Sequence, residues 1–220
     1  MASQTETNRL NDILKGEIEI PHFFSREAVT VLSGQNLTVG AVIGKITKST
    51  PATGTADGGN TGNGTCTDVT GGEDTQLGTY TLECVAEAAN AGTFKVTAPN
   101  GEALPDAEVG TAYINDQINF TLNDDSTDFA VGDKFTITVA AGSGKVVEID
   151  FGAVDGSQDA YGFVIADYDA SAADVEGVAI VRDATMIAAN LVWPDGATAD
   201  QKAAALAQLK ALGIVERTDA

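Results

Sequence analysis

Histidine is rare in this chain, and its position argues against nucleophilic catalysis. Activation of a serine or cysteine usually requires a neighbouring base, and the single histidine, His22, lies ahead of the first predicted domain. No G-x-S-x-G elbow, phosphate-binding loop or dinucleotide fingerprint occurs. The glycine-rich tract at residues 58–64 has no lysine and precedes no predicted helix, so we interpret it as a linker. The sequence therefore predicts no catalytic triad and no nucleotide cofactor.

Carboxylates are the other groups that could do chemistry, and they occur in two clusters. A glycosidase needs two carboxylates in a cleft lined by aromatic residues, but aromatic residues make up only 6% of the chain. Neither cluster has the alternation and the glycine of an EF-hand calcium loop, and acidic loops in a strongly acidic protein are mostly solvated. We therefore predict no catalytic, metal or cofactor site. The clusters are Asp124, Asp125, Asp128 and Asp133, and Asp167, Asp169, Asp174 and Glu176.

Charge and composition argue against several functional classes. Asp and Glu number 32 against 12 Lys and Arg, and the formal net charge of −20 repels nucleic acid phosphates and anionic lipids. The N-terminal stretch has neither a basic leader nor an apolar run, so we predict no signal peptide, no membrane span and synthesis in a cytoplasm. In that reducing compartment Cys66 and Cys84 are expected to be free thiols with a packing role.

The pattern of apolar residues predicts a mainly β protein in which one domain interrupts another. Residues 27–47 contain two β-branched runs joined by a Ser-Gly-Gln-Asn turn, and the pattern resumes at Lys145. The segment between is flanked by Gly, Ser and Thr, a composition that tolerates insertion. We predict a discontinuous β-rich core, residues 25–50 and 146–220, and an inserted domain, residues 51–145.

The inserted segment has the pattern of an antiparallel β-sandwich. Four runs alternate apolar and polar residues, with turns at Asn100-Gly101 and Asn123-Asp124. The segment carries 14 acidic residues against three lysines, so most of its surface is expected to face water. The four runs are GTYTLECVAEA, GTFKVTAPNGEAL, DQINFTLND and DKFTITVAA.

After the insertion, strands are followed by one C-terminal helix. Thr198 and Gln201 form a capping-box pair, and Gly213 follows the last apolar position of the helix. The stretch GIVER is expected to return as a short strand. Trp193 and Pro194 stand just before the helix, and we predict them in the core or at a subunit interface. The residues on the apolar face of the helix are Ala205, Leu206, Leu209 and Leu212.

The first 24 residues are predicted to form an arm, with no turn or cap that ties them to a domain. The stretch from Glu17 to Ile20 alternates glutamate and isoleucine, which is typical of a half-buried strand, and TNRLNDILK favours one or two helical turns. A frayed terminus has the same pattern as an arm that becomes ordered by adding a strand to a partner. Both interpretations stay open.

With the insertion removed, the chain resembles the phage head decoration protein family, the lambda-like capsid stabilisers. The resemblance rests on SREAVTVLSGQNLTVGAVIGKIT, DGSQDAYGFVIADYDA, VAIVRDATMIAANLVWP and LKALGIVER, in this order and spacing. It implies a homotrimer that binds the major capsid protein of the same phage on the outside of the expanded head and stabilises the DNA-filled head. The family's N-terminal arm reaches the coat, which makes the following residues candidate contacts: Leu10, Ile13, Leu14, Ile18, Ile20, Phe23 and Phe24.

The insertion departs from the family pattern. It resembles the immunoglobulin-like modules attached to phage structural proteins, and we predict that it projects outward and is dispensable for capsid binding. Alternatively, the insertion recognises a host-surface or glycan ligand while the rest of the chain serves as a base. An enzyme is the third interpretation, and a pocket with two close carboxylates and a raised pKa would favour it.

Overall fold

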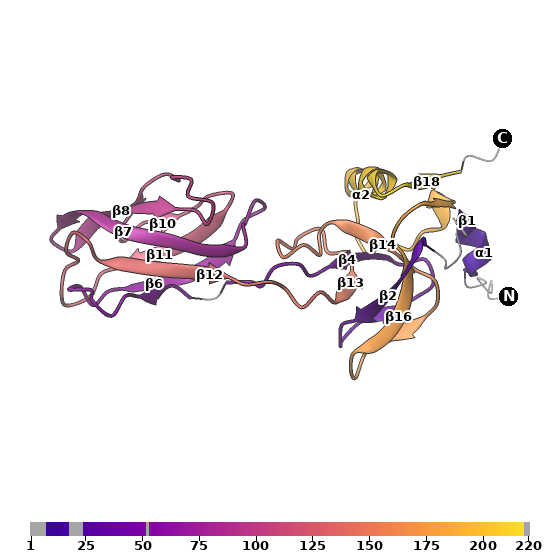
Figure 1. Cartoon of the computed structure of the whole chain (residues 1–220), viewed down its shortest axis with the longest axis horizontal. Coiled ribbons are helices and arrows are strands. Elements are labelled where there is room, and N and C mark those ends of the chain that lie inside the picture. The colour runs from indigo at the N-terminus through magenta and orange to yellow at the C-terminus, as the bar shows by residue number, and fades with distance from the viewer. Residues whose placement is uncertain (1–7, 18–23, 52, 218–220) are drawn as a thin grey trace. The chain divides into compact units, whose positions relative to one another are not determined.

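The computed structural model describes residues 8–17, 24–51 and 53–217. The chain divides into two compact units, which we call unit 1 (Met1–Thr47 with Ser143–Ala220) and unit 2 (Lys48–Gly142) (Figure 1). The described residues are mainly β, with one long helix near the C-terminus. The fold class predicted from the sequence is therefore confirmed.

A closed barrel of five strands forms the centre of unit 1, in the order β13-β2-β16-β14-β4. Closure leaves these strands without a free edge. The strands contribute Val29, Val31, Ile43 and Val164 to one buried cluster, consistent with the β-branched runs that predicted them. The strand bounds are β2 (Arg26–Val31), β4 (Val42–Lys45), β13 (Val146–Glu148), β14 (Ala160–Val164) and β16 (Val175–Ile180).

Two smaller sheets and two short helical elements accompany the barrel of unit 1. One sheet pairs β3 with β15, and the other has the order β1-β17-β18. In the second sheet β1 is antiparallel to β17, and β18 is parallel to it. The bounds are α1 (Leu10–Ile13), β1 (Leu14–Glu17), β3 (Asn36–Leu37), β15 (Tyr168–Asp169), β17 (Ala184–Met186), the 3-10 helix η1 (Ala188–Asn190) and β18 (Ile214–Glu216).

The C-terminal helix α2 (Ala199–Ala211) begins and ends where its sequence signals place it. The Thr198 hydroxyl accepts the Gln201 N–H, and the Gln201 side chain accepts the Thr198 N–H, so both halves of the predicted capping box form. Gly213 has a φ of 79° and allows the chain to turn into β18, the strand predicted from GIVER. On the predicted apolar face Ala205 and Leu209 are buried, whereas Leu212 is 38% exposed.

Unit 2 joins unit 1 at the tip of a β-hairpin. Strands β4 and β13 pair antiparallel, and the pairing continues past their ends, because the Ile46 N–H donates to the Lys145 carbonyl and the Gly144 N–H donates to the Ile46 carbonyl. Beyond this point Lys48 and Ala141 form an isolated antiparallel bridge. The chain therefore leaves and re-enters unit 1 on adjacent strands.

Two antiparallel sheets enclose a single core in unit 2. Their orders are β5-β12-β7-β8-β9 and β10-β11-β6. Both cysteines are free and buried in this core, and burial raises the pKa of Cys66 to about 12. The four predicted runs correspond to β7, β8, β11 and β12. The bounds are β5 (Thr55–Ala56), β6 (Thr65–Gly71), β7 (Gly78–Ala88), β8 (Ala91–Thr97), β9 (Ala107–Glu108), β10 (Ala112–Tyr113), β11 (Ile118–Asn123) and β12 (Lys134–Val139).

The glycine-rich tract at residues 58–64 is a packed loop, so its interpretation as a linker was wrong. The buried Asp133 carboxylate accepts the N–H groups of Thr61 and Gly62 at 2.8 Å and of Ala130 at 3.0 Å. A Cβ on Gly64 would lie 2.2 Å from the Phe129 ring, so glycine lets the backbone approach that ring. Gly62 and Gly64 thus allow close packing against Phe129.

Candidate interaction surface

The described part of the N-terminal segment, residues 8–17, packs against the rest of unit 1. Ile13 is fully buried in a cluster that also contains Met186 and Leu209, and Leu14 packs against the same cluster. Gly40 leaves room for the Ile13 side chain, because a Cβ at position 40 would lie 2.2 Å from Ile13 Cδ1. The expectation that nothing ties residues 8–17 to a domain was therefore wrong.

Polar contacts fix the same segment. The Ile187 N–H donates to the Ile13 carbonyl at 2.8 Å, and the Asn190 side chain donates to the Asp12 carbonyl at 2.8 Å. At the other end of β1, Arg26 donates two hydrogen bonds to the Glu17 carboxylate, at 2.6 and 2.8 Å. Such a paired arrangement orients both side chains.

The predicted contact residues fall into three groups. Leu10, Ile13 and Leu14 lie in or beside α1, half-buried or buried, while Phe24 is 54% exposed just before β2. Ile18, Ile20 and Phe23 lie outside the described residues. Trp193 and Pro194 are half-buried, and Trp193 packs against the cluster that contains Leu209.

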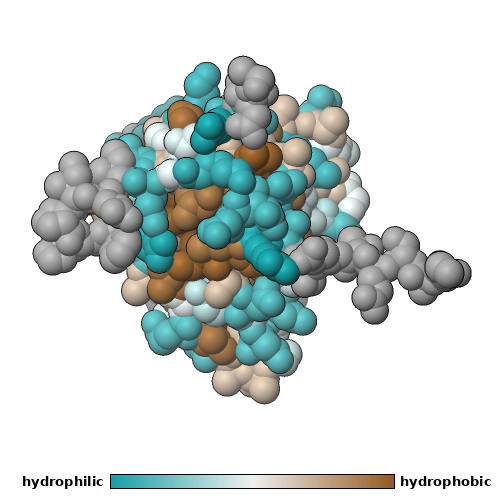
Figure 2. All heavy atoms as spheres, turned by 90° about the vertical axis from the view of Figure 1, so that its right-hand side faces the viewer, coloured by the Kyte–Doolittle hydropathy of each residue, from teal (hydrophilic) through white to brown (hydrophobic). Residues whose placement is uncertain are grey.

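An exposed apolar area lies on the end of unit 1 that carries both ends of the described chain (Figure 2). We call it the terminal face and define it as Phe24, β1, β17, β18 and residues 206–212. Val215 is 40% exposed and lies between two grooves. One groove, of about 360 Å³, is lined by Met186, Leu206, Ala207, Lys210, Ile214, Val215 and Glu216.

The sheet at the terminal face has open edges. Strand β17 is central, so β1 and β18 each have one edge that no described strand pairs. An unpaired edge can accept a strand from another chain through main-chain hydrogen bonds. The terminal face therefore offers both apolar surface and strand edges to a partner.

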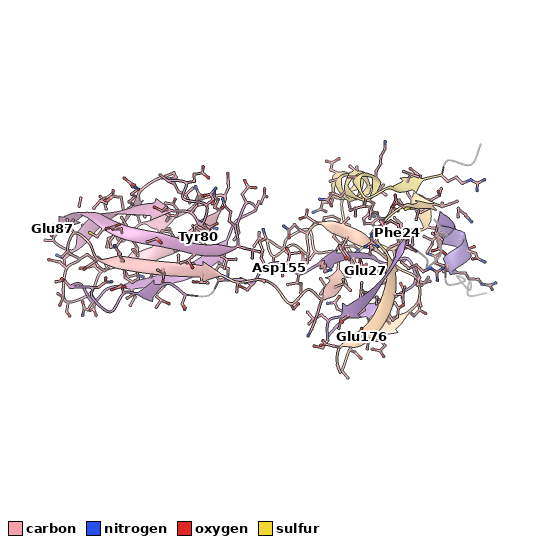
Figure 3. The ribbon with its side chains drawn as sticks, viewed as in Figure 1. Phe24, Glu27, Tyr80, Glu87, Asp155 and Glu176 are labelled. Carbon is pink, nitrogen blue, oxygen red and sulfur yellow. The ribbon has the colours of Figure 1, made fainter. Side chains whose placement is uncertain are left out.

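A network of charged and polar side chains that includes Glu27 lies next to Phe24 on the terminal face (Figure 3). The Arg182 guanidinium lies 5.3 Å from the centre of the Phe24 ring and also pairs with Glu27. The Tyr161 hydroxyl donates to Glu27 at 2.5 Å, and Lys45 donates to that hydroxyl at 3.1 Å. The Tyr161 hydrogen bond, with help from Arg182, lowers the pKa of Glu27 against the opposing effect of burial. This network holds Arg182 under the exposed ring.

The terminal face was only partly predictable. Phe24 belonged to the predicted contacts, but Val215 and Met186 did not. The stretch GIVER predicted a strand without indicating that the strand lies at a sheet edge. Met186 lies in a run of mixed residues that carries no periodic signal.

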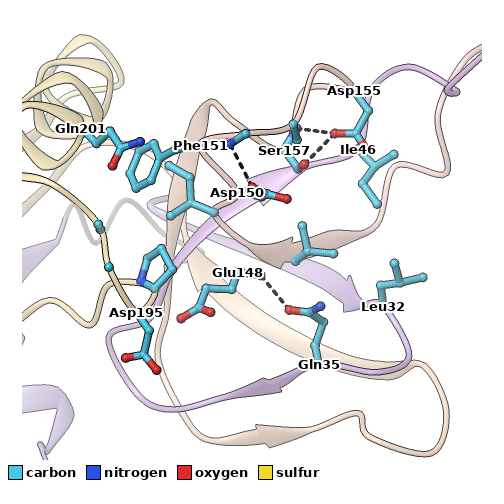
Figure 4. Close-up of a pocket in the computed structure, with 17 residues that line it drawn as sticks. Leu32, Gln35, Ile46, Glu148, Asp150, Phe151, Asp155, Ser157, Asp195 and Gln201 are labelled. Atoms are coloured by element: carbon cyan, nitrogen blue, oxygen red, sulfur yellow. Dashed lines mark hydrogen bonds between the residues drawn. The ribbon is translucent and has the colours of Figure 1, made fainter. Parts of the chain in front are cut away.

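A further pocket of unit 1, of about 570 Å³, contains carboxylates (Figure 4). Burial raises the pKa of Glu148, with a smaller contribution from the Asp195 charge. The other carboxylates stabilise the loop, because Asp150 accepts the Gly152 N–H and Asp155 accepts the Ser157 N–H and hydroxyl. The Ser157 hydroxyl donates to the Asp155 carboxylate, and no histidine is among the described residues that line the pocket. The raised pKa of Glu148 beside Asp195 is the one feature that the enzyme interpretation named and that this pocket contains.

The two acidic clusters of the sequence also stabilise loops. Asp167 accepts the Val39 N–H, Asp174 accepts the Ser33 N–H and pairs with Lys145, and Asp128 accepts the Asn90 N–H. In the described ranges no group of three or more His, Cys, Asp and Glu side chains is placed to hold a metal ion.

Unit 2 presents aliphatic rather than aromatic side chains to solvent. Among its described residues the large exposed apolar side chains are Leu77, Val85, Ile114 and Val131. Sugar rings commonly stack on exposed aromatic rings, and the described aromatic side chains of this unit are buried. None of the helices in the described ranges combines the length and apolar character of a membrane span.

Comparison with known proteins gives one extensive match. The family model described as bacteriophage lambda head decoration protein D matches residues 3–214. No curated protein sequence matches the chain. Two crystal structures of Xanthomonas campestris FlgL align with 54% of this chain at 16% identity and a TM-score of 0.31, and the alignment covers 34% and 33% of the FlgL chains. This low similarity carries no argument.

Proposed function

The chain belongs to the bacteriophage lambda head decoration protein D family, and from this membership we propose that it binds the outside of the expanded phage head as a trimer and stabilises it. The family is one of structural proteins of the phage head. The observation that carries the proposal is the family match over residues 3–214, which spans nearly the whole chain.

The proposed stabilisation follows from mass action. A protein that binds the assembled lattice and not its separated subunits stabilises the lattice by about 2.7 kcal/mol per site at a hundredfold excess over the dissociation constant. Repeated over many sites, this opposes the outward pressure of packaged DNA. The net charge of −20 keeps the outer surface soluble, while salt screens repulsion between copies beyond about 8 Å.

We assign the terminal face to the major capsid protein. The support is its exposed apolar area, its open strand edges and the N-terminal segment that lies on it. Leu14 and Phe24 would contact the coat from this face, and Leu10 would contact it from α1, which precedes β1. Ile18, Ile20 and Phe23 follow β1 in the chain, and the proposal keeps them as coat contacts; the buried side chain of Ile13 would act by anchoring the segment.

We further propose that the core of the decoration protein is residues 25–50 and 146–220, and that residues 51–145 form an immunoglobulin-like module inserted into it. The support is the connection at the tip of the β4–β13 hairpin, where the Gly144 N–H donates to the Ile46 carbonyl. The half-buried Trp193 and Pro194 are candidates for the contact between the three copies.

Replacing residues 48–142 by Asn-Gly should leave a folded protein that still binds heads. The change shortens the connection between Ile46 and Gly144 to a tight hairpin turn, for which Asn-Gly is a preferred sequence. Far-UV circular dichroism and cosedimentation with heads check the result. Aggregation of the shortened chain would show that unit 1 requires unit 2 to fold, contrary to the proposal.

Cosedimentation of the full chain with expanded and unexpanded empty heads of its source phage tests the function itself. We expect saturable binding to expanded heads, close to one copy per coat subunit, and weaker binding to unexpanded heads. Saturation at this ratio would agree with trimers on threefold positions. Absence of binding to both forms would overturn the proposal.

A further inference from the structure

Two Asn-Gly pairs occur in the chain, Asn63-Gly64 and Asn100-Gly101, both in unit 2. In such a pair the backbone nitrogen of the glycine can attack the side-chain carbonyl carbon of the asparagine, since glycine has no side chain to obstruct the approach. By sequence the two pairs are equivalent. Their surroundings in the fold are not.

Asn100 lies at an exposed turn, which the Ala98 N–H closes by donating to the Glu102 carbonyl at 2.8 Å. The Gly101 N–H donates to the Ala98 carbonyl at 2.9 Å, and Gly101 has a φ of 86° with no atom within 4 Å of the position that a Cβ would take. The Asn100 side-chain carbonyl accepts the Glu102 N–H at 3.0 Å. This bond turns the side chain toward the following backbone and polarises the carbonyl that would be attacked.

Asn63 is exposed as a residue, but its side chain is fixed by a distant part of unit 2. Its amide nitrogen donates to Asp125 at 3.2 Å and to Ser126 at 3.0 Å, and its carbonyl accepts the Thr127 N–H at 2.9 Å. Gly64 is buried, with the Phe129 ring against its backbone. Attack by the Gly64 nitrogen would require these contacts to break together.

We propose that Asn100 is a site of spontaneous deamidation in the folded protein and that the fold protects Asn63. The Gly101 nitrogen forms a bond to Asn100 Cγ and loses its proton, while the bond from Cγ to Nδ2 breaks and ammonia leaves. Water then opens the resulting succinimide at either carbonyl, which yields aspartate or isoaspartate. No reactant other than water is consumed.

The reaction requires the Gly101 N–H to leave the Ala98 carbonyl, an opening of one turn. Exposed turns open locally at low free energy, whereas freeing Asn63 means opening the packed loop around Asp133. The product adds a negative charge beside Glu102, and isoaspartate also lengthens the backbone of the turn. If the chain serves on assembled heads as proposed, its copies are not replaced by synthesis, so the modified fraction would increase with particle age.

Peptide mapping of the purified full chain, aged at mildly alkaline pH with and without urea, tests this inference. In the folded protein we expect deamidation at Asn100 to be at least about tenfold faster than at Asn63, because the two local openings differ in free energy. In urea the two rates should become comparable. The variant Asn100→Ser assigns the modified peptide. Equal rates in the folded protein, or modification at Asn100 only in urea, would overturn the proposal, and neither outcome depends on head binding.

Discussion

Replacing Val215 by aspartate should lower the binding of this protein to expanded heads by at least about tenfold, equivalent to a loss of about 1.4 kcal/mol. Val215 is 40% exposed on β18, between the two grooves of the terminal face. Covering this side chain with coat protein would remove apolar surface from water, worth about 1 kcal/mol for a partly exposed valine. An aspartate there would instead have its charge desolvated, which is unfavourable without a partner.

The same change should leave the fold intact. The Val215 side chain points to solvent, and its backbone pairing with Thr185 is available to any residue except proline. Ile114→Asp is a matched control, because Ile114 is 84% exposed but belongs to unit 2. Cosedimentation at a fixed subsaturating concentration compares the variants, with thermal unfolding as a check of folding. A folded Val215→Asp protein that binds as well as the Ile114→Asp control would contradict the assignment of the terminal face.

Elements with strong local signals were predictable from the sequence. The run GTYTLECVAEA is β7, because alternating apolar residues define a strand with one buried face. The helix α2 begins at its capping box and ends before a glycine with positive φ, both of which are encoded within a few residues. Such signals do not depend on the rest of the chain.

Features that depend on contacts between distant residues were not predictable in this way. The segment around Ile13 was predicted to have no contact with a domain. Ile13 packs against Gly40 and against a buried cluster whose residues come from distant parts of the chain. The terminal face likewise combines Phe24 with residues of β17, α2 and β18. A periodic pattern within one stretch of sequence does not indicate which distant residues that stretch contacts.

The glycine-rich tract is another feature that depends on a distant residue. Replacing that residue, Asp133, is expected to have a large effect on the stability of unit 2. Composition predicted a linker, but residues 58–64 are held by Asp133, a residue about seventy positions later. Asp133→Ala should remove three charge-assisted hydrogen bonds at once and leave N–H groups of Thr61, Gly62 and Ala130 unpaired. We expect a loss of about 4 kcal/mol in the free energy of unfolding of unit 2, a large part of the stability of a domain of this size.

The loss should be confined to unit 2. The single tryptophan, Trp193, lies in unit 1, so its fluorescence reports unit 1 while hydrogen exchange of peptides from residues 58–64 reports the loop. Asp128→Ala is a matched control, because the exposed Asp128 accepts one backbone N–H, that of Asn90. If Asp133→Ala and Asp128→Ala unfold at the same urea concentration, the loop does not depend on Asp133 for its stability.

The pH dependence of the same residue gives an independent test. Burial alone raises the pKa of Asp133, but the N–H groups of Thr61, Ala130 and Gly62 outweigh it and hold the pKa below its ordinary value. A carboxyl whose pKa is lower in the folded state contributes stability above its unfolded pKa, about 3.9, and loses that contribution as the pH falls through its folded value.

Wild-type unit 2 should therefore lose stability on acidification below about pH 5 more steeply than the Asp133→Asn variant. The Asp133→Asn variant should be less stable at neutral pH, since its amide replaces one accepting oxygen with a donor that faces the same N–H groups. Parallel pH profiles for the two proteins would mean that the Asp133 carboxylate is not the group whose protonation weakens the loop.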